Sequence, residues 1–157
     1  MNIFITDPSP EQSAIYLDDK RVNKMILESA QMLSTALRCH GHDGTGIYKQ
    51  THKNHPSNVW ARETRSNYLW LLEHFKCLYE QKILRTEKGH KSFDLYGILM
   101  DNTYLIPKGD LTPFVNCAAN SSLGISYKHL TDVFDAYKLY LNDRWKGDKK
   151  TPTWYGI

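Results

Sequence analysis

Residues 18–41 read DDKRVNKMILESAQMLSTALRCHG and carry a clear helical signal. An aspartate pair stands before the apolar pattern and Gly41 follows it, which are typical start and stop signals of a helix. The inward positions recur at steps of three and four residues: Val22, Ile26, Ser29, Leu33 and Leu37. The stretch therefore predicts an amphipathic helix, and we expect the rest of the chain to pack against it.

The sequence on either side of this helix predicts further helices and little strand. The expected elements are a first helix capped by Ser9 with Pro10 at its first position, a long helix from Ser57 to Thr86 that can contain a break, a shorter helical piece from Phe93 to Met100, and a last helix from Ser126 to Trp145. Residues 2–6 are expected to form a short strand or an extended tether. We therefore predict a mainly α, compact helical bundle, a single domain over residues 1–157, with an irregular C-terminal tail.

Composition is that of a globular protein. The 157 residues are 41% apolar and 24% charged, enough to bury a core without covalent staples. Three widely spaced cysteines do not form a disulfide framework, and the N-terminus has neither a basic leader nor a long apolar run. These features predict a cytoplasmic protein with no membrane partner.

Positive charge is concentrated in two places. Lys49, Lys53, Arg62 and Arg65 stand against one acid, Glu63, and the tail carries a second cluster. A local positive field of this kind favours nucleic acid as the partner. The residues expected to contact nucleic acid are Lys53, Trp60, Arg62, Arg65, Lys149, Lys150, Trp154 and Tyr155.

Residues 51–63, THKNHPSNVWARE, predict a site at a helix entrance. Ser57 is the candidate cap, and the exposed N–H groups of a helix start favour an anionic ligand. His52 and His55 can donate to phosphate or transfer protons near neutral pH. A metal site with Cys39, His40 and His42 is the alternative, but the spacing matches no known zinc pattern, so we expect no metal or cofactor.

A second candidate site is a polar stripe on the helix predicted over residues 18–41. It consists of Asp18, Arg21, Lys24 and Glu28. A carboxylate there can stabilise a developing positive charge while the cations bind phosphates. The alternative is a solvated face with weak intrahelical ion pairs.

The tail, Pro152 to Tyr155, also has two possible roles. Its aromatic rings either cover the core or line a groove for unstacked bases.

Four segments resemble a phage-encoded family: Asp18 to Met25, Glu28 to Leu33, Tyr48 to Pro56, and Val59 to Glu63. The Pro-Thr-Trp-Tyr tail and the acidic, arginine-bearing early helix further resemble phage pyrimidine-dimer DNA glycosylases of the endonuclease V type. That resemblance implies an amine nucleophile that forms an imine. Because Asn2 is too bulky for usual methionine removal, this amine would belong to Met1 or to a lysine such as Lys24.

The leading functional prediction is a DNA glycosylase and abasic-site lyase of the phage-infected host cytoplasm, acting on duplex DNA with a flipped base. Its expected catalytic residues are Asp18, Arg21, Lys24, Glu28, His52 and His55. Two alternatives use the same residues differently. One is an enzyme acting on a nucleotide or small phosphorylated metabolite, and the other is a non-catalytic phage effector that binds a host protein or nucleic acid.

Overall fold

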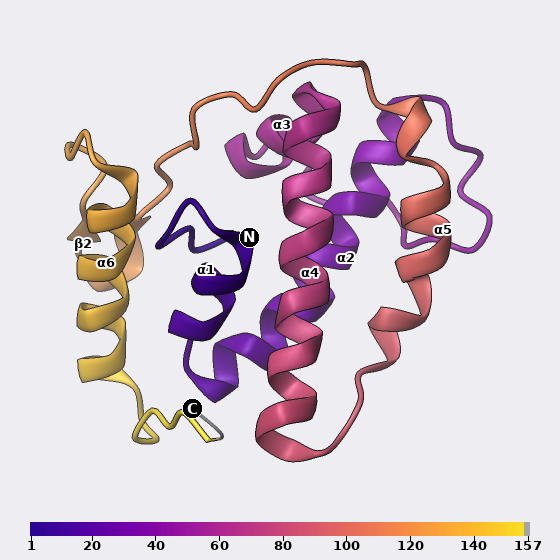
Figure 1. Ribbon diagram of the computed structural model, residues 1–157. Helices are drawn as coiled ribbons and strands as arrows, with labels where there is room; N and C mark the ends of the chain where they lie inside the picture. Colours follow the sequence, from indigo (N-terminus) through magenta and orange to yellow (C-terminus); the bar gives the residue numbers. More distant parts are fainter. Residues whose placement is uncertain (156–157) are drawn as a thin grey trace.

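The structure is a computed structural model, and it describes residues 1–155. The domain predicted over residues 1–157 therefore includes two residues, 156–157, that lie outside the described range. Within it the chain forms six α-helices, three short 3-10 helices and one small antiparallel sheet (Figure 1). The α-helices are α1 (Pro10–Tyr16), α2 (Asp19–Cys39), α3 (Pro56–Glu63), α4 (Arg65–Thr86), α5 (Tyr96–Asp101) and α6 (Val133–Gly147). The 3-10 helices are η1 (Lys91–Leu95), η2 (Thr103–Leu105) and η3 (Ser121–Leu123), and the strands are β1 (Ala119–Asn120) and β2 (Ile125–Ser126). The predicted mainly α fold is confirmed.

The core is centred on α2 and α4, which pack side by side along much of their length. α3 packs against both of them, and α1 packs against α4. α2 buries the face that its periodicity predicts, with Val22, Ile26 and Leu33 removed from solvent. α4 contributes Leu71 and Phe75 from the opposite side. Burial of these apolar side chains is the main force that holds the bundle together.

Helix starts follow local capping chemistry. The Ser9 side chain accepts a hydrogen bond from Gln12 N, as predicted. At α3 the cap is His55 rather than Ser57, because Pro56 occupies the first helical position and the cap must precede it. The Thr64 side chain caps α4 by accepting from Asn67 N, and the extended backbone of Thr64 separates α3 from α4. The predicted break in the long helix is therefore confirmed.

The last predicted helix differs from the structure at its start. α6 begins at Val133 rather than at Ser126, because the Asp132 side chain accepts from Phe134 N and Asp135 N and so starts the helix there. Ser126 instead pairs with Ala119 across the small sheet. Residues 2–6 form no strand, which leaves the tether of the two forms expected there, with a left-handed backbone at Phe4.

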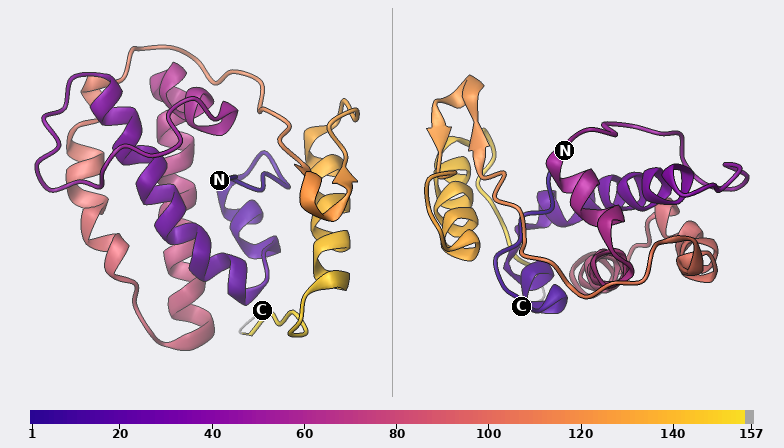
Figure 2. Two further views of the ribbon diagram at one scale, coloured as in Figure 1. Left: turned by 180° about the vertical axis from the view of Figure 1, so that it is seen from behind. Right: turned by 90° about the horizontal axis from the view of Figure 1, so that it is seen from above.

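α6 and the small sheet lie on one side of α1, with the α2–α4 pair on the other side (Figure 2). Contacts at both of its ends attach α6 to the bundle. The Phe4 ring packs against Tyr137 and Tyr140 of α6. At the other end the tail is bound to the start of α2, where Thr153 O accepts from Asp19 N at 2.8 Å. The terminal segments thus place α6 beside the start of the chain.

In the described part of the chain, none of the helices combines the length and apolar character that crossing a bilayer requires.

His74 gives the bundle a pH-dependent stability. Its ring is fully buried, stacks on Trp70 and hydrogen-bonds through Nδ1 to Pro10 O at 2.9 Å. Burial lowers the pKa of His74 to about 4, despite the opposing effect of that hydrogen bond. The unfolded chain therefore takes up a proton near pH 6.5 that the folded chain accepts only near pH 4.

We expect the free energy of unfolding to be highest above pH 7 and to fall as the pH drops from 6.5 towards 4, by about 3 kcal/mol for His74 alone. Urea unfolding at several pH values measures this loss. In a His74→Gln variant the amide can still donate to Pro10 O but does not titrate, so the loss should shrink. An equally steep loss in the variant would contradict this assignment.

Candidate active site

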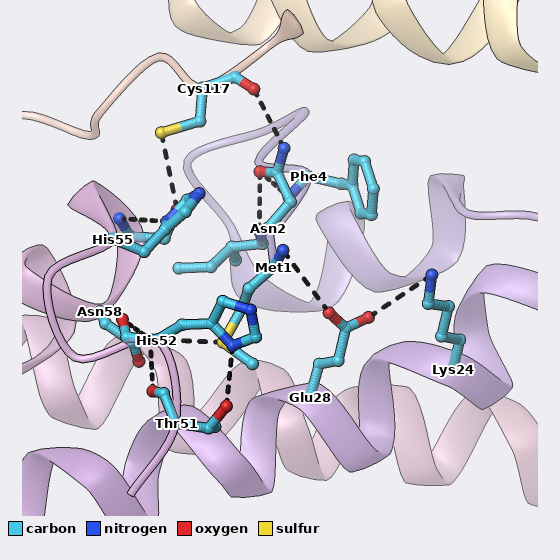
Figure 3. Close-up of polar contacts among 12 residues, drawn as sticks. Met1, Asn2, Phe4, Lys24, Glu28, Thr51, His52, His55, Asn58 and Cys117 are labelled. Atoms are coloured by element: carbon cyan, nitrogen blue, oxygen red, sulfur yellow. Dashed lines mark hydrogen bonds and ion pairs between the residues drawn. The ribbon is translucent and has the colours of Figure 1, made fainter. Parts of the chain in front are cut away.

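The α-amine of Met1 lies beside a carboxylate on α2. Its nitrogen is 4.0 Å from Glu28 Oε1, and Glu28 Oε2 is 4.0 Å from Lys24 Nζ (Figure 3). The Met1 side chain is 2% exposed and that of Glu28 16%, whereas the Lys24 side chain is 66% exposed. The amine and the carboxylate therefore meet at a largely enclosed point, and Lys24 lies at its outer edge.

The two histidines of residues 51–63 lie on the other side of Met1 from Glu28 (Figure 3). His52 is exposed and its Nδ1 contacts Thr51 Oγ1 at 2.8 Å. His55 is half-buried, and burial lowers its pKa, with smaller contributions from the charges of the N-terminal amine and His52. His55 Nδ1 accepts from Ser57 N, so the proton of the neutral ring is on Nε2. The neutral ring therefore has no free basic nitrogen, and its Nε2–H is a hydrogen-bond donor.

The segment that carries the histidines is tied to α2 and α3. Asn58 of α3 donates through Nδ2 to Thr51 O at 3.2 Å and to His52 O at 2.7 Å, and Thr51 N donates to Thr35 Oγ1 of α2. His52 itself has a left-handed backbone with φ of 47°, a conformation that is costly for a residue with a side chain. The surrounding hydrogen bonds therefore impose the position of His52.

The predicted site residues separate into two groups. The structure brings Glu28, His52 and His55 together around Met1, with Lys24 joined through its ion pair. The juxtaposition of the early helix with the proline-marked segment is thus confirmed for these residues. The α-amine of Met1 is central, and only the resemblance to the glycosylases indicated it.

Asp18 and Arg21 belong to a separate buried network at the start of α2. Arg21 Nη1 is 3.2 Å from Asp18 Oδ1 and 2.9 Å from Asp148 Oδ2, and Trp145 Nε1 donates to Asp18 Oδ1 at 2.8 Å. The hydrogen bond from Arg21 lowers the pKa of Asp148. The predicted four-residue stripe is therefore divided, because its first two members are paired with the end of α6.

Of the residues expected to contact nucleic acid, Trp60 is buried, and Arg62 and Arg65 make hydrogen bonds within the fold while staying partly exposed. Trp60 is 1% exposed and packs against Trp70 and Phe114, so its indole is not available for stacking on a base. Arg65 donates to the carbonyls of Ile106 and Tyr104, and Arg62 donates to Lys53 O. The prediction for Trp60 is wrong because its side chain is on the buried face of α3 and belongs to the core. Lys53 remains exposed near the histidines.

The tail residues lie at a groove of about 950 Å³ between the start of α2 and the end of α6. Lys149 and Lys150 are exposed and line it together with Lys20 and Arg144. Trp154 is half-buried, donates to Tyr16 O at 3.1 Å and contacts the Trp145 ring edge-on, so it docks the tail. Tyr155 is 62% exposed.

Two histidines of the metal alternative are engaged elsewhere. His40 Nε2 contacts Arg62 O, and His42 Nδ1 accepts from Gly44 N. Among residues 1–155 no three histidine, cysteine, aspartate or glutamate side chains are grouped so that they could hold a metal ion.

Fold and site together define a helical protein in which a primary amine, a carboxylate and two imidazoles converge beside cationic surface. Residues 1–94 match the sequence model of the family described as pyrimidine dimer DNA glycosylase. The match covers more than half of the 157 residues, and the chain belongs to this family of DNA-acting enzymes. No curated protein and no solved structure matches the chain.

Proposed function

We propose that the protein excises a damaged pyrimidine base from duplex DNA and then cleaves the strand at the abasic site, with the α-amine of Met1 as the nucleophile. The observation that carries this proposal is the approach of that amine to Glu28, in a chain of a DNA glycosylase family. A duplex hides the glycosidic carbon, so the target nucleotide would have to leave the base stack.

The residues around the amine fit such a reaction. The lone pair of the unprotonated amine would form a bond to C1′ of the sugar while the bond from C1′ to the base breaks and the departing base takes up a proton. Glu28, whose Oε1 is 4.0 Å from the amine, is suited to accept the proton that the amine loses, whereas the one basic nitrogen of neutral His55 is engaged by Ser57 N. The carboxylate of Glu28 would stabilise the positive charge that grows on the sugar.

Strand cleavage would follow from the covalent intermediate. Opening of the sugar ring, with protonation of its oxygen, converts the new C–N bond to a protonated imine. Loss of a proton from C2′ then expels the 3′ phosphate and breaks the strand. Glu28 is the carboxylate near the amine that can accept this proton. Borohydride reduces the imine and fixes the sugar to the protein.

The groove beside α6 supports a role in holding the DNA backbone. Its acids are already engaged, since Asp148 pairs with Arg21 and Asp143 accepts from the Tyr127 hydroxyl. The side chains of Lys20, Lys149 and Lys150 are exposed at the same groove. Lys20 precedes Glu28 by eight residues, about 12 Å along α2, which corresponds to roughly three to four base pairs of duplex. We propose that these lysines contact phosphates on one side of the reacting nucleotide.

The proposed nucleophile predicts a covalent adduct at one defined residue. Incubation with duplexes that contain ultraviolet photoproducts, uracil or an abasic site, in the presence of borohydride, should yield an adduct with photoproduct-containing and abasic DNA. Mass spectrometry of the digested adduct should place the sugar on the peptide that begins with Met1, and the intact mass reports whether Met1 is retained. Absence of both nicking and adduct would remove the proposal and leave the metabolite-enzyme and effector alternatives.

Two variants assign the roles within the site. Glu28→Gln keeps the size of the side chain but removes its charge, so adduct formation should slow on the order of a hundredfold or more. Lys24→Ala removes the other nearby amine and should leave the Met1 adduct in place. Loss of the adduct in Lys24→Ala, with wild-type melting temperature, would make Lys24 the nucleophile instead.

The groove predicts a change in the salt dependence of DNA binding. A Lys149→Ala, Lys150→Ala double variant should lose up to two phosphate contacts, so the slope of log affinity against log salt should become shallower by about 1.8. The matched control is Lys91→Ala, Lys108→Ala, which removes the same charge from exposed positions outside the groove. Equal slopes for the two double variants would contradict the proposed contacts.

A further inference from the structure

The side chain of Asn2 is held at both ends. Its Nδ2 donates to Cys117 O at 3.1 Å, and its Oδ1 accepts from the Tyr137 hydroxyl at 2.7 Å. Cys117 N in turn donates to the same Tyr137 oxygen at 3.0 Å. A closed set of hydrogen bonds therefore links the start of the chain, the segment before the small sheet, and α6.

A strained turn follows Asn2. Its Oδ1 also accepts from Ile3 N at 2.9 Å, and the next residue, Phe4, has a left-handed backbone with φ of 59°. Such a conformation is unfavourable for a bulky residue and persists only where its surroundings impose it. Here the Phe4 ring packs against Tyr137 and Tyr140. The same α6 residue, Tyr137, thus supports both Asn2 and Phe4.

The side chain of Met1 has an anchor of its own. It is 2% exposed, and its Sδ lies 3.3 Å from Asn58 Nδ2. The same amide group donates to the carbonyls of Thr51 and His52 (Figure 3). One asparagine therefore sets the position of the Met1 side chain relative to the histidine segment.

We infer that Tyr137, acting through Asn2, and Asn58, acting through the Met1 thioether, are positioning residues that hold the α-amine at Glu28. This inference rests on the proposed function. The first residues of a chain fray unless they are tied down, and a nucleophile displaced by about 1 Å can lose a hundredfold in rate. Two anchors on either side of the amine restrict it far more than the single 4.0 Å ion pair with Glu28.

Tyr137→Phe tests the anchor, with Tyr68→Phe as its matched control. Each tyrosine is fully buried and donates one hydrogen bond from its hydroxyl, Tyr68 to Leu99 O at 2.6 Å. The control bond joins α4 to α5, away from Met1. Both substitutions remove one buried hydroxyl, but the Tyr137 oxygen also accepts from Cys117 N, so Tyr137→Phe is expected to lower the melting temperature somewhat more than the control. Rates are therefore compared well below both melting temperatures, where each variant is folded and a difference in rate reflects the anchor rather than stability.

In single-turnover reactions with abasic duplex, Tyr137→Phe should form the borohydride-trapped adduct on the order of tenfold to a hundredfold more slowly than wild type. Its dissociation constant for the duplex should stay within about twofold, because Tyr137 is buried and makes no DNA contact. Tyr68→Phe should retain the wild-type rate within about twofold. Equal rates for the two variants would overturn the inference.

A second measurement is independent of catalysis. The chain has four methionines, so a protein labelled at the methionine methyl carbons gives a simple NMR spectrum. Substitution of Met25, Met32 and Met100 in turn assigns three signals and leaves the Met1 signal by elimination. Tyr137→Phe should raise the mobility of the Met1 methyl group, and Asn58→Ser should do so more strongly. An unchanged Met1 signal in folded Tyr137→Phe would also overturn the inference. If wild type forms no adduct at all, the proposed function fails, and this signal still decides whether the anchor exists.

Discussion

The pairing of the Met1 α-amine with Glu28 is the contact on which the candidate site depends, because it joins two segments that fold for different reasons. Glu28 is placed by α2, whose apolar face is buried against α4. The amine is placed by the hydrogen bonds of Asn2 and by the enclosed side chain of Met1. The α-amine of Met1 thus meets Glu28 of α2, and the segment with His52 and His55 lies beside Met1.

The site and its supports divide between two parts of the chain. The segment that matches the glycosylase family, residues 1–94, contains Met1, Glu28, His52 and His55, and it spans α1 to α4. α6 lies outside that segment, yet it holds Tyr137 and leads into the lysines of the groove. The proposed reacting groups are therefore within the family segment, while the C-terminal part contributes the hydrogen bond to Asn2 and the lysines of the groove.

Much of the fold could be predicted from local signals. The periodicity of residues 18–41 identified α2, and the Ser9–Pro10 pair identified the start of α1. The convergence of Glu28 with the histidines was also predictable as a hypothesis, since both lie on or beside helices that can pack. The true cap of α3 was missed because Pro56 moves the cap to His55.

Long-range pairing could not be predicted. Arg21 pairs with Asp148, 127 residues away, and Tyr137 contacts Asn2 across 135 residues. No local sequence pattern around these residues reveals either contact. Tyr137 lies at an inward position of α6, which from the sequence indicates only packing in the core. Burial of Trp60 is a similar case, because its packing partners Trp70 and Phe114 come from separate segments.

Chemical blocking of one nitrogen tests the central claim most directly. Protein whose Met1 α-amine alone is acetylated, with every lysine unmodified, can be compared with unmodified protein in strand cleavage of an abasic duplex. The account predicts that cleavage and borohydride trapping are lost while the fold is retained and the duplex is still bound. Undiminished cleavage by the acetylated protein would contradict it.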